Sequence, residues 1–494
     1  MKILSASQIR SADAYTIQHE PVSSINLMER AAAACVEWIS KNAEKNYSFK
    51  IFCGPGNNGG DGLAIARMLL NAGFETKVFI VRESDKYSAD FLENEKRLSN
   101  YHPLAIQNIK SEKDFPVIGY DDCVIDALFG TGLSKPLTGI FSKLIESINS
   151  SDAEIISIDL PSGLYADQHS DGVAIIHANH TLSFQLPKLA FMFAENEKYV
   201  GDFHLLEIGL DREFIAEIPA ANNYLSKYFL QTLLKPRKKF SHKGNYGHAL
   251  LVAGSKGKMG AALLAAKGCL RTGVGLLTMH VPETGIDIMQ ISCPEAMVAI
   301  GEMDFNKYAA IGIGPGIGIE AGAKEILKKY FHFAKAPMVL DADALNIISE
   351  ERELLKLIPA NSILTPHPKE FERLAGKTEN DFERHELQLF FSKNHKVYVV
   401  LKGAHTCITT PDGISYFNST GNPGMAKCGS GDVLTGIITS LLAQGYSSLE
   451  SALLGVYLHG LAGDIAADKK GMDGMITRDV VNGVGEAWKN LRKS

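Results

Sequence analysis

Two glycine-rich loops, one in each half of the chain, constrain the fold more than any other feature. The first is Gly54-Pro55-Gly56-Asn57-Asn58-Gly59-Gly60-Asp61-Gly62, and the second is Cys428-Gly429-Ser430-Gly431-Asp432-Val433-Leu434-Thr435-Gly436. Each follows extended sequence and leads into a helical run, so backbone N–H groups and a helix N-terminus face whatever lies above the loop. This arrangement is typical of phosphate binding, and it predicts two separate sites.

The length of 494 residues also predicts two domains, because one hydrophobic core rarely organises so long a chain. A regular alternation of apolar and helical segments fades near residues 209–211. A polar, basic stretch then runs from Asn222 to Gly244 before the alternation resumes. We therefore expect one domain at 1–218 and a second at 222–494.

Both halves have the pattern of an α/β fold. In the first half, short apolar runs at 50–53, 77–81, 123–126 and 155–159 alternate with helix-like segments, and Ser5 with Gln8 fits a capping box before them. Such alternation predicts a mostly parallel, doubly wound sheet whose ligand crevice lies at the carboxyl ends of the strands.

The second half restarts the same alternation. An apolar run at 248–254 precedes an Ala-rich helix expected at 260–271. Further strands are expected at 308–313, 338–340, 362–365 and 397–401. This half is therefore also expected to form an α/β domain.

Charge and cysteine content exclude several classes of protein. The formal net charge is −6, and the densest basic patch is only 235–239, so nucleic acid is not expected as a partner. The seven cysteines show no Cys-x-x-Cys spacing, which argues against disulfides and zinc and favours reduced thiols. No stretch approaches the ~20 apolar residues of a membrane helix, and the N-terminus lacks a signal-peptide core. We expect a soluble, cytoplasmic protein with no membrane partner.

In the second half, the turn Gly429-Ser430-Gly431-Asp432 has the most specific chemistry. Small residues let the backbone wrap an anion, and a carboxylate at a helix start, which we place at Asp432, can take a proton from a hydroxyl while phosphate is held beside it. The alternative is a helix-capping aspartate. Upstream, residues 422–425 and 402–406 supply small and polar groups that suit an adenine nucleotide.

Three further motifs of this half have structural alternatives. His367, between Pro366 and Pro368, is either a substrate contact or a structural histidine. Residues 254–259 resemble a P-loop, but Met259 stands where Ser or Thr must bind magnesium. The glycines of 312–318 do not fit the dinucleotide fingerprint, and we interpret them as a backbone wall that a ligand can approach closely.

In the first half, Asn58, Asp126 and Ser162 each lie at the tip of a different predicted strand. They offer oxygen ligands with a single carboxylate, which suits potassium better than zinc or magnesium; the alternative is three turn-forming residues. Asp159, just before Leu160-Pro161-Ser162-Gly163, is the remaining carboxylate able to carry proton chemistry there.

The first half resembles the NAD(P)H-hydrate epimerase domain. The resemblance rests on 27–31 (Leu-Met-Glu-Arg-Ala), the 54–62 loop, Asp126-Ala127-Leu128-Phe129-Gly130-Thr131-Gly132 and 159–163. Ala32 departs from the glycine that often follows the first of these motifs. The second half resembles the ADP- or ATP-dependent NAD(P)H-hydrate dehydratases of the ribokinase-like superfamily, through 257–262, 365–370, 402–406 and 422–436. The chain therefore resembles a fused, bifunctional nicotinamide-nucleotide repair enzyme.

The resemblance implies a Rossmann-like first domain with a hydrated-nucleotide site and a potassium ion. The nucleotide contacts would be Asn57, Asn58, Gly59, Gly60, Asp61, Gly130, Thr131, Gly132, Leu133, Ser134, Lys135, Pro136 and Asp159. Potassium would be held by Asn58, Asp126 and Ser162.

The same resemblance implies a ribokinase-like second domain that uses Mg²⁺ with ADP or ATP. The hydrated substrate would contact Ala261, Gly316 or Gly318, His367 and Asp432, and the short glycine repeat allows either alignment. The adenine nucleotide would contact Lys402, Gly403, Ala404, His405, Thr406 and Gly431. The family also implies a homo-oligomer and, among its bacterial members, ADP.

The implied chemistry has two parts. Asp432 would direct the hydroxyl of the hydrate onto the terminal phosphate, and phosphate would then leave. Asp159 would exchange protons while the R and S epimers interconvert. Two alternatives remain open: a small-molecule kinase, and a first domain that only binds ligand. The choice between ADP and ATP, and between NADH and NADPH hydrates, is also left open.

Overall fold

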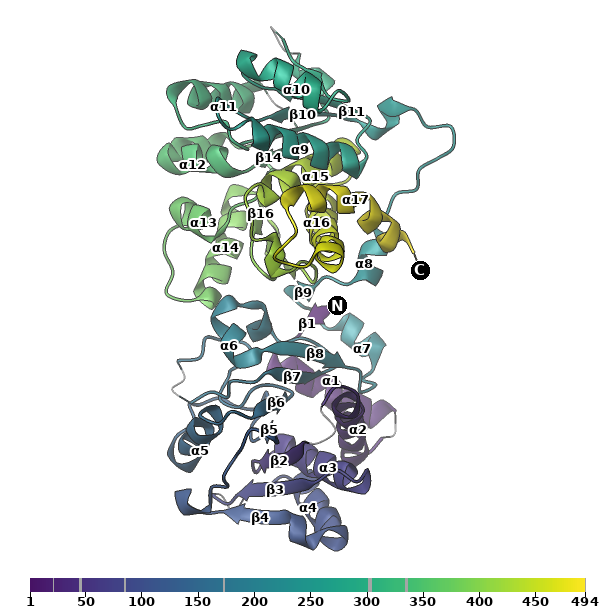
Figure 1. Ribbon diagram of the computed structural model, residues 1–494, viewed down its shortest axis with the longest axis vertical. Coiled ribbons are helices and arrows are strands. Elements are labelled where there is room, and N and C mark those ends of the chain that lie inside the picture. Colours follow the sequence, from purple (N-terminus) through teal and green to yellow (C-terminus); the bar gives the residue numbers. More distant parts are fainter. Residues whose placement is uncertain are drawn as a thin grey trace. The chain divides into compact units, whose positions relative to one another are not determined.

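The computed structural model describes residues 1–20, 22–43, 47–83, 86–171, 174–300, 304–333 and 336–493 (Figure 1). The chain divides into two compact units. The N-terminal unit contains Lys2–Ala220 with residues 380–382, and the C-terminal unit contains Met1, Ala221–Glu379 and Glu383–Ser494. No helix of the described ranges combines the length and the apolar character needed to cross a bilayer.

The N-terminal unit alternates strands and helices, as predicted. Its elements are β1 (Lys2–Ile3), α1 (Ala6–His19), α2 (Ser24–Asn42), β2 (Ser48–Cys53), α3 (Asn57–Asn71), β3 (Thr76–Val81), α4 (Ala89–Tyr101), β4 (Ile106–Ile109), β5 (Asp122–Ala127), α5 (Gly139–Asn149), β6 (Glu154–Ile158), β7 (His180–Phe184), α6 (Glu197–Val200), β8 (Asp202–Leu206) and α7 (Arg212–Glu217). The capping box of Ser5 with Gln8 begins α1, which confirms that prediction.

The sheet of this unit has the order β4-β3-β2-β5-β6-β7-β8, and all neighbouring strands are parallel. Its two faces pack into separate cores. Ile51 and Ile125 face the core formed with α2, α3 and α4, whereas Phe52 and Val124 face the core formed with α5. Helices thus cover both faces of a parallel sheet, the doubly wound arrangement predicted from the sequence (Figure 1).

The C-terminal unit has a longer sheet. Its elements are β9 (Asn222–Tyr224), α8 (Lys227–Thr232), β10 (His248–Val252), α9 (Met259–Thr272), β11 (Leu276–His280), α10 (Ile286–Ser292), β12 (Met297–Val298), β13 (Ala310–Ile313), α11 (Ala321–Phe333), β14 (Met338–Leu340), α12 (Ala342–Glu350), β15 (Ile363–Leu364), α13 (Pro368–Ala375), α14 (Asp381–His395, in this unit from Glu383), β16 (Tyr398–Leu401), β17 (Cys407–Thr409), β18 (Ser415–Phe417), α15 (Ser430–Ala443), α16 (Ser448–Lys470) and α17 (Thr477–Arg492).

The strand order here is β9-β18-β17-β16-β15-β14-β13-β10-β11-β12. The strands from β16 to β12 along this order are parallel, while β16, β17 and β18 form an antiparallel meander. One face packs against α9, α15, α16 and α17, and the other against α11, α12 and α13. The α/β prediction is therefore confirmed in both units, and each sheet presents the carboxyl ends of its parallel strands to one edge.

Helices α9 and α15 lie side by side (Figure 1). Glycines let their backbones approach closely: a Cβ on Gly436 would lie 2.0 Å from the carbonyl oxygen of Ala265, and one on Gly268 would lie 2.7 Å from that of Val433. The two helices are thus a tightly packed pair, and both begin at the same functional edge of the sheet.

Candidate functional sites

The first glycine-rich loop is shorter than the sequence indicated, because α3 already begins at Asn57. Gly59 in its first turn lies directly on the preceding strand exit: a Cβ there would be 1.9 Å from the carbonyl oxygen of Gly54. Only glycine permits this approach. The close packing places the N-terminus of α3, with Asn58 and Asp61, at the carboxyl end of β2.

A cavity of about 640 Å³ opens above this edge of the N-terminal sheet. The predicted residues that line it are Asn57, Asn58, Asp61, Gly130, Thr131, Gly132, Leu133 and Asp159. Gly59 and Gly60 are buried beneath it, and Ser134, Lys135 and Pro136 are exposed outside the lining. The volume is in the range of small-molecule sites.

Helix α1 supplies a wall of this cavity that the sequence analysis missed. Ile9, Asp13 and Ile17 line it at helical spacing. Burial, followed by the negative charge of Asp159, raises the pKa of Asp13 to about 6. Because α1 lies before the first glycine-rich loop and carries no motif, only its apolar spacing indicated a buried face.

Asp126 and Ser162 form a buried hydrogen-bond network below the cavity. The carboxylate of Asp126 accepts hydrogen bonds from the Ser162 hydroxyl at 2.6 Å, the Ser162 backbone N–H at 2.9 Å and the Ser157 hydroxyl at 2.8 Å. Burial raises the pKa of Asp126, and these hydrogen bonds oppose the rise. The structure thus brings Asp126 and Ser162 together, and Ser157 joins them from β6.

Asn58 is buried beside the cavity, and neither its side-chain oxygen nor its nitrogen has a hydrogen-bond partner in the described part of the chain. A Cβ on Gly130 would lie 3.4 Å from the Asn58 Cγ and 3.3 Å from Asp159 Oδ2. Asn58 and Asp159 therefore flank the same point of the cavity. A buried amide without partners is costly unless a ligand completes its hydrogen bonds or coordination.

Asp159 follows β6 with a φ of 66°, a backbone conformation that side-chain-bearing residues seldom adopt. Its Oδ1 lies 2.9 Å from the Nζ of Lys188, whose side chain is 1% exposed. Lys188 also donates to the Ser183 hydroxyl and the Leu186 carbonyl. Lys188 was missed in the sequence, although a lysine in an apolar run is nearly always paired when buried.

Asp61 is another carboxyl group that lines this cavity. Burial, followed by the charges of Asp159 and Asp13, raises its pKa well above the ordinary range. Burial therefore favours the neutral form of the Asp61 carboxyl, while Asp159 faces the ammonium group of Lys188. The cavity can hold an acid and a salt-bridged carboxylate a short distance apart.

In the C-terminal unit, α15 begins at Ser430 after Gly429, so Asp432 is the third residue of the helix and not its start, as we had predicted. The difference arises because Gly429, at a φ of 90°, already provides the left-handed turn into the helix. The carboxylate of Asp432 still lies in the first turn, where the helix dipole favours negative charge.

The N-terminus of α15 meets the exits of β14 and β16. The Lys402 Nζ lies 2.9 Å from Asp341 Oδ1, and the Thr435 hydroxyl donates to Asp341 Oδ2 at 2.8 Å. A Cβ on Gly431 would lie 3.4 Å from the Lys402 Nζ. Gly431, Lys402 and the missed residue Asp341 therefore converge. An aspartate directly after the buried run Met338-Val339-Leu340 was the available sequence signal for Asp341.

Burial, followed by the negative charge of Asp341, raises the pKa of Asp432 to about 7, and the positive charge of Lys402 opposes this rise. The pKa of Lys402 is also raised overall, because the negative charges of Asp341 and Glu370 outweigh burial, which lowers it. The site thus contains a fixed cation beside a carboxyl group that changes charge near neutral pH. A group with this pKa is suited to act as a general base.

The remaining predicted residues lie around this cluster. A Cβ on Gly316 would contact Ala261 at 3.1 Å, whereas the Gly318 N–H donates to Asp343. His367 caps α13 and accepts a hydrogen bond from the Glu370 backbone through Nδ1 at 3.3 Å, and burial lowers its pKa.

Residues 402–406 form a tight turn after β16. The Thr406 hydroxyl donates to the Gly403 carbonyl at 3.0 Å and accepts from the Gly403 N–H at 3.3 Å. The His405 Nδ1 lies 3.0 Å from the Asn418 carbonyl oxygen, and burial lowers the pKa of this histidine. The turn is therefore closed by hydrogen bonds between the Thr406 hydroxyl and the Gly403 backbone.

Comparison with known proteins gives the same division of the chain. Residues 249–484 match the family model described as NAD(P)H-hydrate dehydratase, and residues 24–190 match that of the YjeF-related protein N-terminus. A curated relative from Thermofilum pendens, named bifunctional NAD(P)H-hydrate repair enzyme, is 35% identical over all of this chain and 97% of its own. A relative from Moorella thermoacetica with the same name is 35% identical, and the match covers 100% of this chain and 98% of the relative.

A solved structure is similar to the C-terminal unit. It is a ribokinase-like superfamily protein from Enterococcus faecalis, with 28% identity and a TM-score of 0.50, covering 55% of this chain and 98% of that chain. The C-terminal unit therefore has the ribokinase-like fold expected from the sequence.

Proposed function

This chain belongs to the family of bifunctional NAD(P)H-hydrate repair enzymes, and we propose that each of its two units carries one of the two activities. The C-terminal unit dehydrates the S form of hydrated NADH or NADPH at the expense of ADP or ATP. The N-terminal unit interconverts the R and S epimers, so that both forms are repaired.

One observation carries the dehydration proposal: Asp432, with a pKa of about 7, lies at a helix N-terminus beside Lys402 and Asp341. In its ionised form Asp432 takes the proton of the hydrate's hydroxyl as that oxygen attacks the terminal phosphorus. The N–H groups of 429–431 and the Lys402 ammonium stabilise charge on the transferred phosphoryl group. Asp341 positions Lys402.

The second step restores the reduced nicotinamide. The lone pair of the ring nitrogen expels the phosphate with its C–O bonding electrons, and loss of a proton from the neighbouring ring carbon forms the C=C bond. With ADP the balance is hydrate plus ADP giving NAD(P)H, AMP and phosphate. Ala261, Gly316 or Gly318, and His367 contact the hydrated nucleotide, whereas Lys402, Gly403, Ala404, His405, Thr406 and Gly431 contact the adenine nucleotide.

Mg²⁺ is expected to enter with the phosphates of the nucleotide. No group of three or more His, Cys, Asp or Glu side chains in the described ranges could hold a metal ion by itself. The phosphate oxygens would therefore supply most of its ligands, as is usual for Mg²⁺.

For the N-terminal unit, we propose that the hydrated nucleotide occupies the 640 Å³ cavity. Its contacts are Asn57, Asn58, Gly59, Gly60, Asp61, Gly130, Thr131, Gly132, Leu133, Ser134, Lys135, Pro136 and Asp159. Asp159 donates and accepts the proton as water leaves the hydrated carbon and returns on its other face. Lys188 holds the carboxylate in place, and Asp61, whose pKa is raised by burial, faces the same space.

Potassium fits the oxygen atoms of this unit. The Asn58 amide is buried without a partner, and Asp126 and Ser162 lie at the neighbouring strand exits. Weakly charged oxygen ligands suit a monovalent cation. Bound there, the ion would supply a fixed positive charge for the substrate's phosphates.

The reaction products distinguish the proposed dehydratase activity from a kinase activity. Purified protein is incubated with the S hydrate, magnesium and ADP or ATP, and phosphate, AMP and nicotinamide absorbance are followed together. The proposal predicts free phosphate and recovered absorbance in equal amounts. A stable phosphoester without recovered absorbance would mean that the unit is a kinase.

A further inference from the structure

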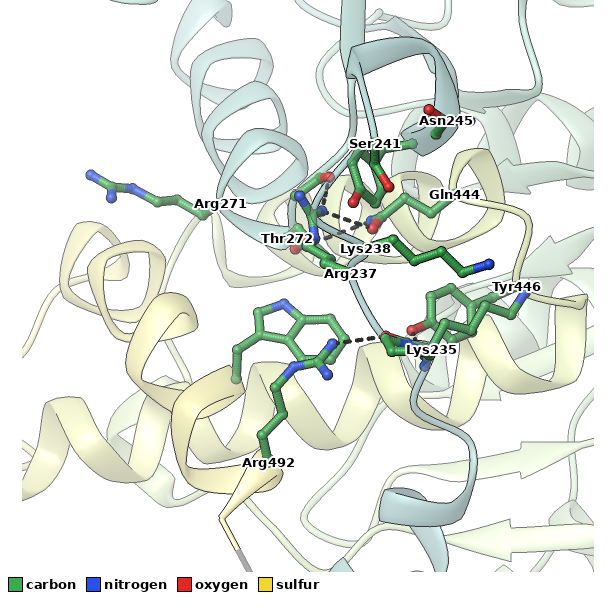
Figure 2. Close-up of a pocket in the computed structure, with 14 residues that line it drawn as sticks. Lys235, Arg237, Lys238, Ser241, Asn245, Arg271, Thr272, Gln444, Tyr446 and Arg492 are labelled. Carbon is green, nitrogen blue, oxygen red and sulfur yellow. Dashed lines mark hydrogen bonds between the residues drawn. The ribbon is translucent and has the colours of Figure 1, made fainter.

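A second hollow, of about 480 Å³, lies in the C-terminal unit (Figure 2). It is lined by the segment 235–246 before β10, by 271–273 at the end of α9, by Gln444 and Tyr446 after α15, and by Trp488 and Arg492 of α17. None of these residues belongs to the catalytic cluster. The volume is within the range of small-ligand sites.

The hollow is strongly positive. Lys235, Arg237, Lys238 and Arg492 gather around it, while the side chain of Arg271 points away (Figure 2). The lining contains no Asp or Glu, and in the described part of the chain none of these five cations forms an ion pair with a carboxylate. A chain with a net charge of −6 therefore carries an uncompensated cationic cluster at this place.

Helix ends explain only part of this charge. The helices α9, α15 and α17 all end here, and each C-terminus carries roughly −0.5 charge, about −1.5 in all. The four cations around the hollow exceed this by more than two charges. Compensation of helix dipoles alone would not need so many cations.

Three of the cations are held in place by neutral groups. The Arg237 guanidinium lies 3.9 Å from the Tyr246 ring centroid and donates to the Gly273 carbonyl and Gln444. Lys235 lies 4.5 Å from the Tyr446 ring, and Arg492 lies 5.2 Å from the Trp488 ring.

These contacts fix the positions of the cations but leave their charges available to a ligand. The Lys238 side chain has no hydrogen-bond or ion-pair partner in the described ranges. The Trp488 Nε1, a buried donor, also has no acceptor there.

The hollow is well separated from the catalytic cluster. Ala261 and Asp432 lie in the first turns of α9 and α15, whereas the hollow lies beyond the last turns of the same helices. About 11 or 12 residues at 1.5 Å each give a separation of about 17 Å. Two separate ligands could therefore bind at the same time, one in the hollow and one at the catalytic cluster.

We propose that this hollow binds a small ligand with two or more phosphate groups. Several fixed cations around one hollow match several anionic oxygens, and arginine and lysine are the usual phosphate contacts. The three aromatic rings already stack on cations, so the phosphates and not a base are recognised. A nucleic acid would need a longer basic track, and 235–239 is the densest basic run of the chain.

Calorimetric titration of the full chain with inorganic tripolyphosphate tests the proposal. Lys238→Gln/Arg492→Gln removes two cations of the hollow. Lys239→Gln/Lys489→Gln is the matched control, because neither lysine lines the hollow and each lies close in sequence to a cation that does. We expect the first double variant to bind at least about tenfold more weakly than the wild type and the control to bind like the wild type. Thermal unfolding checks folding, and Lys238→Gln alone, which removes no internal contact, should show the same direction.

The outcomes are distinct. Equal binding by all three proteins would place the phosphates at the catalytic loops and overturn the proposal, as would no binding by the wild type. Tighter binding of a short RNA, lost in the first variant, would replace a small ligand with a nucleic acid. Titration with ADP identifies the kind of phosphate-bearing ligand. A second ADP site that is lost in the first variant indicates a nucleotide. A single ADP site that the variant does not affect indicates a phosphorylated metabolite without adenine.

Discussion

The Nζ atom of Lys188 lies 2.9 Å from Oδ1 of Asp159, and the lysine side chain is almost completely buried. Asp159 is held in a left-handed backbone conformation directly after β6, and Lys188 follows β7, the next strand of the sheet. A buried ion pair of this kind costs desolvation on both sides, so it contributes little net stability. Its position at the cavity wall agrees with a role in placing the Asp159 carboxylate for proton transfer.

The variant Lys188→Met tests whether Lys188 places the Asp159 carboxylate for the reaction or only affects the stability of the N-terminal unit. It leaves the Asp159 carboxylate in the protein without a counter-ion, which typically costs about 3–5 kcal/mol. We expect urea unfolding of the N-terminal unit to shift accordingly and epimer interconversion to fall at least about 10²-fold. Dehydration of the S epimer should stay unchanged.

The double variant Asp159→Asn/Lys188→Met is the control for this experiment. Because both charges are removed, it should be more stable than Lys188→Met while remaining inactive as an epimerase. Full epimerase activity in Lys188→Met would show that the ion pair has no part in the reaction.

Asp432→Asn tests the proposed base of the C-terminal unit. The amide keeps the shape of the side chain but cannot accept the hydroxyl proton, so dehydration should fall by about 10²–10⁴. Binding of ADP, measured by calorimetry, should persist because the loop N–H groups remain. Near-normal turnover in this variant would exclude Asp432 as the base.

The pH dependence of dehydration follows from the raised pKa of Asp432, which burial brings to about 7. The base must be ionised to accept a proton, so kcat/KM should fall tenfold per pH unit below about 7 and level off above it. Steady-state rates between pH 5 and 9 measure this. A profile that is flat down to pH 5 would contradict the assignment.

The same shift predicts a gain in stability for Asp432→Asn. The pKa of Asp432 is about 7 in the folded protein and ordinary in the unfolded chain, so the folded state binds more protons between about pH 4 and 7 and loses stability as the pH rises through this window. Asparagine removes this loss. The Tm of the C-terminal unit should therefore rise relative to wild type at pH 8, with no such difference at pH 4; a lower Tm at pH 8 would contradict it.

Much of the fold could be predicted because its strands are short apolar runs. The runs at 50–53, 77–81 and 123–126 correspond to β2, β3 and β5, and the Ala-rich helix corresponds to α9. The order of the strands could not be predicted, since it depends on which helices cover which face. Short strands such as β12 and β15 also carry too few residues for a periodic pattern.

Candidate site residues were easiest to identify in the sequence where a glycine-rich loop marked them. Asn58, Asp126 and Ser162 could be grouped because each lies at or just beyond the carboxyl end of a parallel strand, and such ends share one edge of a sheet. Lys188 and Asp341 could not be assigned roles, because their partners Asp159 and Lys402 come from distant segments that only the sheet order brings together. Asp432 lay two residues deeper in its helix than expected because a glycine, not the aspartate, makes the turn.

One measurement tests the central claim most directly. A mixture of both NADH-hydrate epimers is incubated with the full chain, potassium, magnesium and either ADP or ATP, and the recovery of nicotinamide absorbance is followed to completion. Two active units predict recovery of the whole mixture, with the more effective nucleotide identified by rate. Recovery that stops when the S epimer is exhausted would contradict the epimerase assignment, and consumption of nucleotide without recovery would contradict the dehydratase.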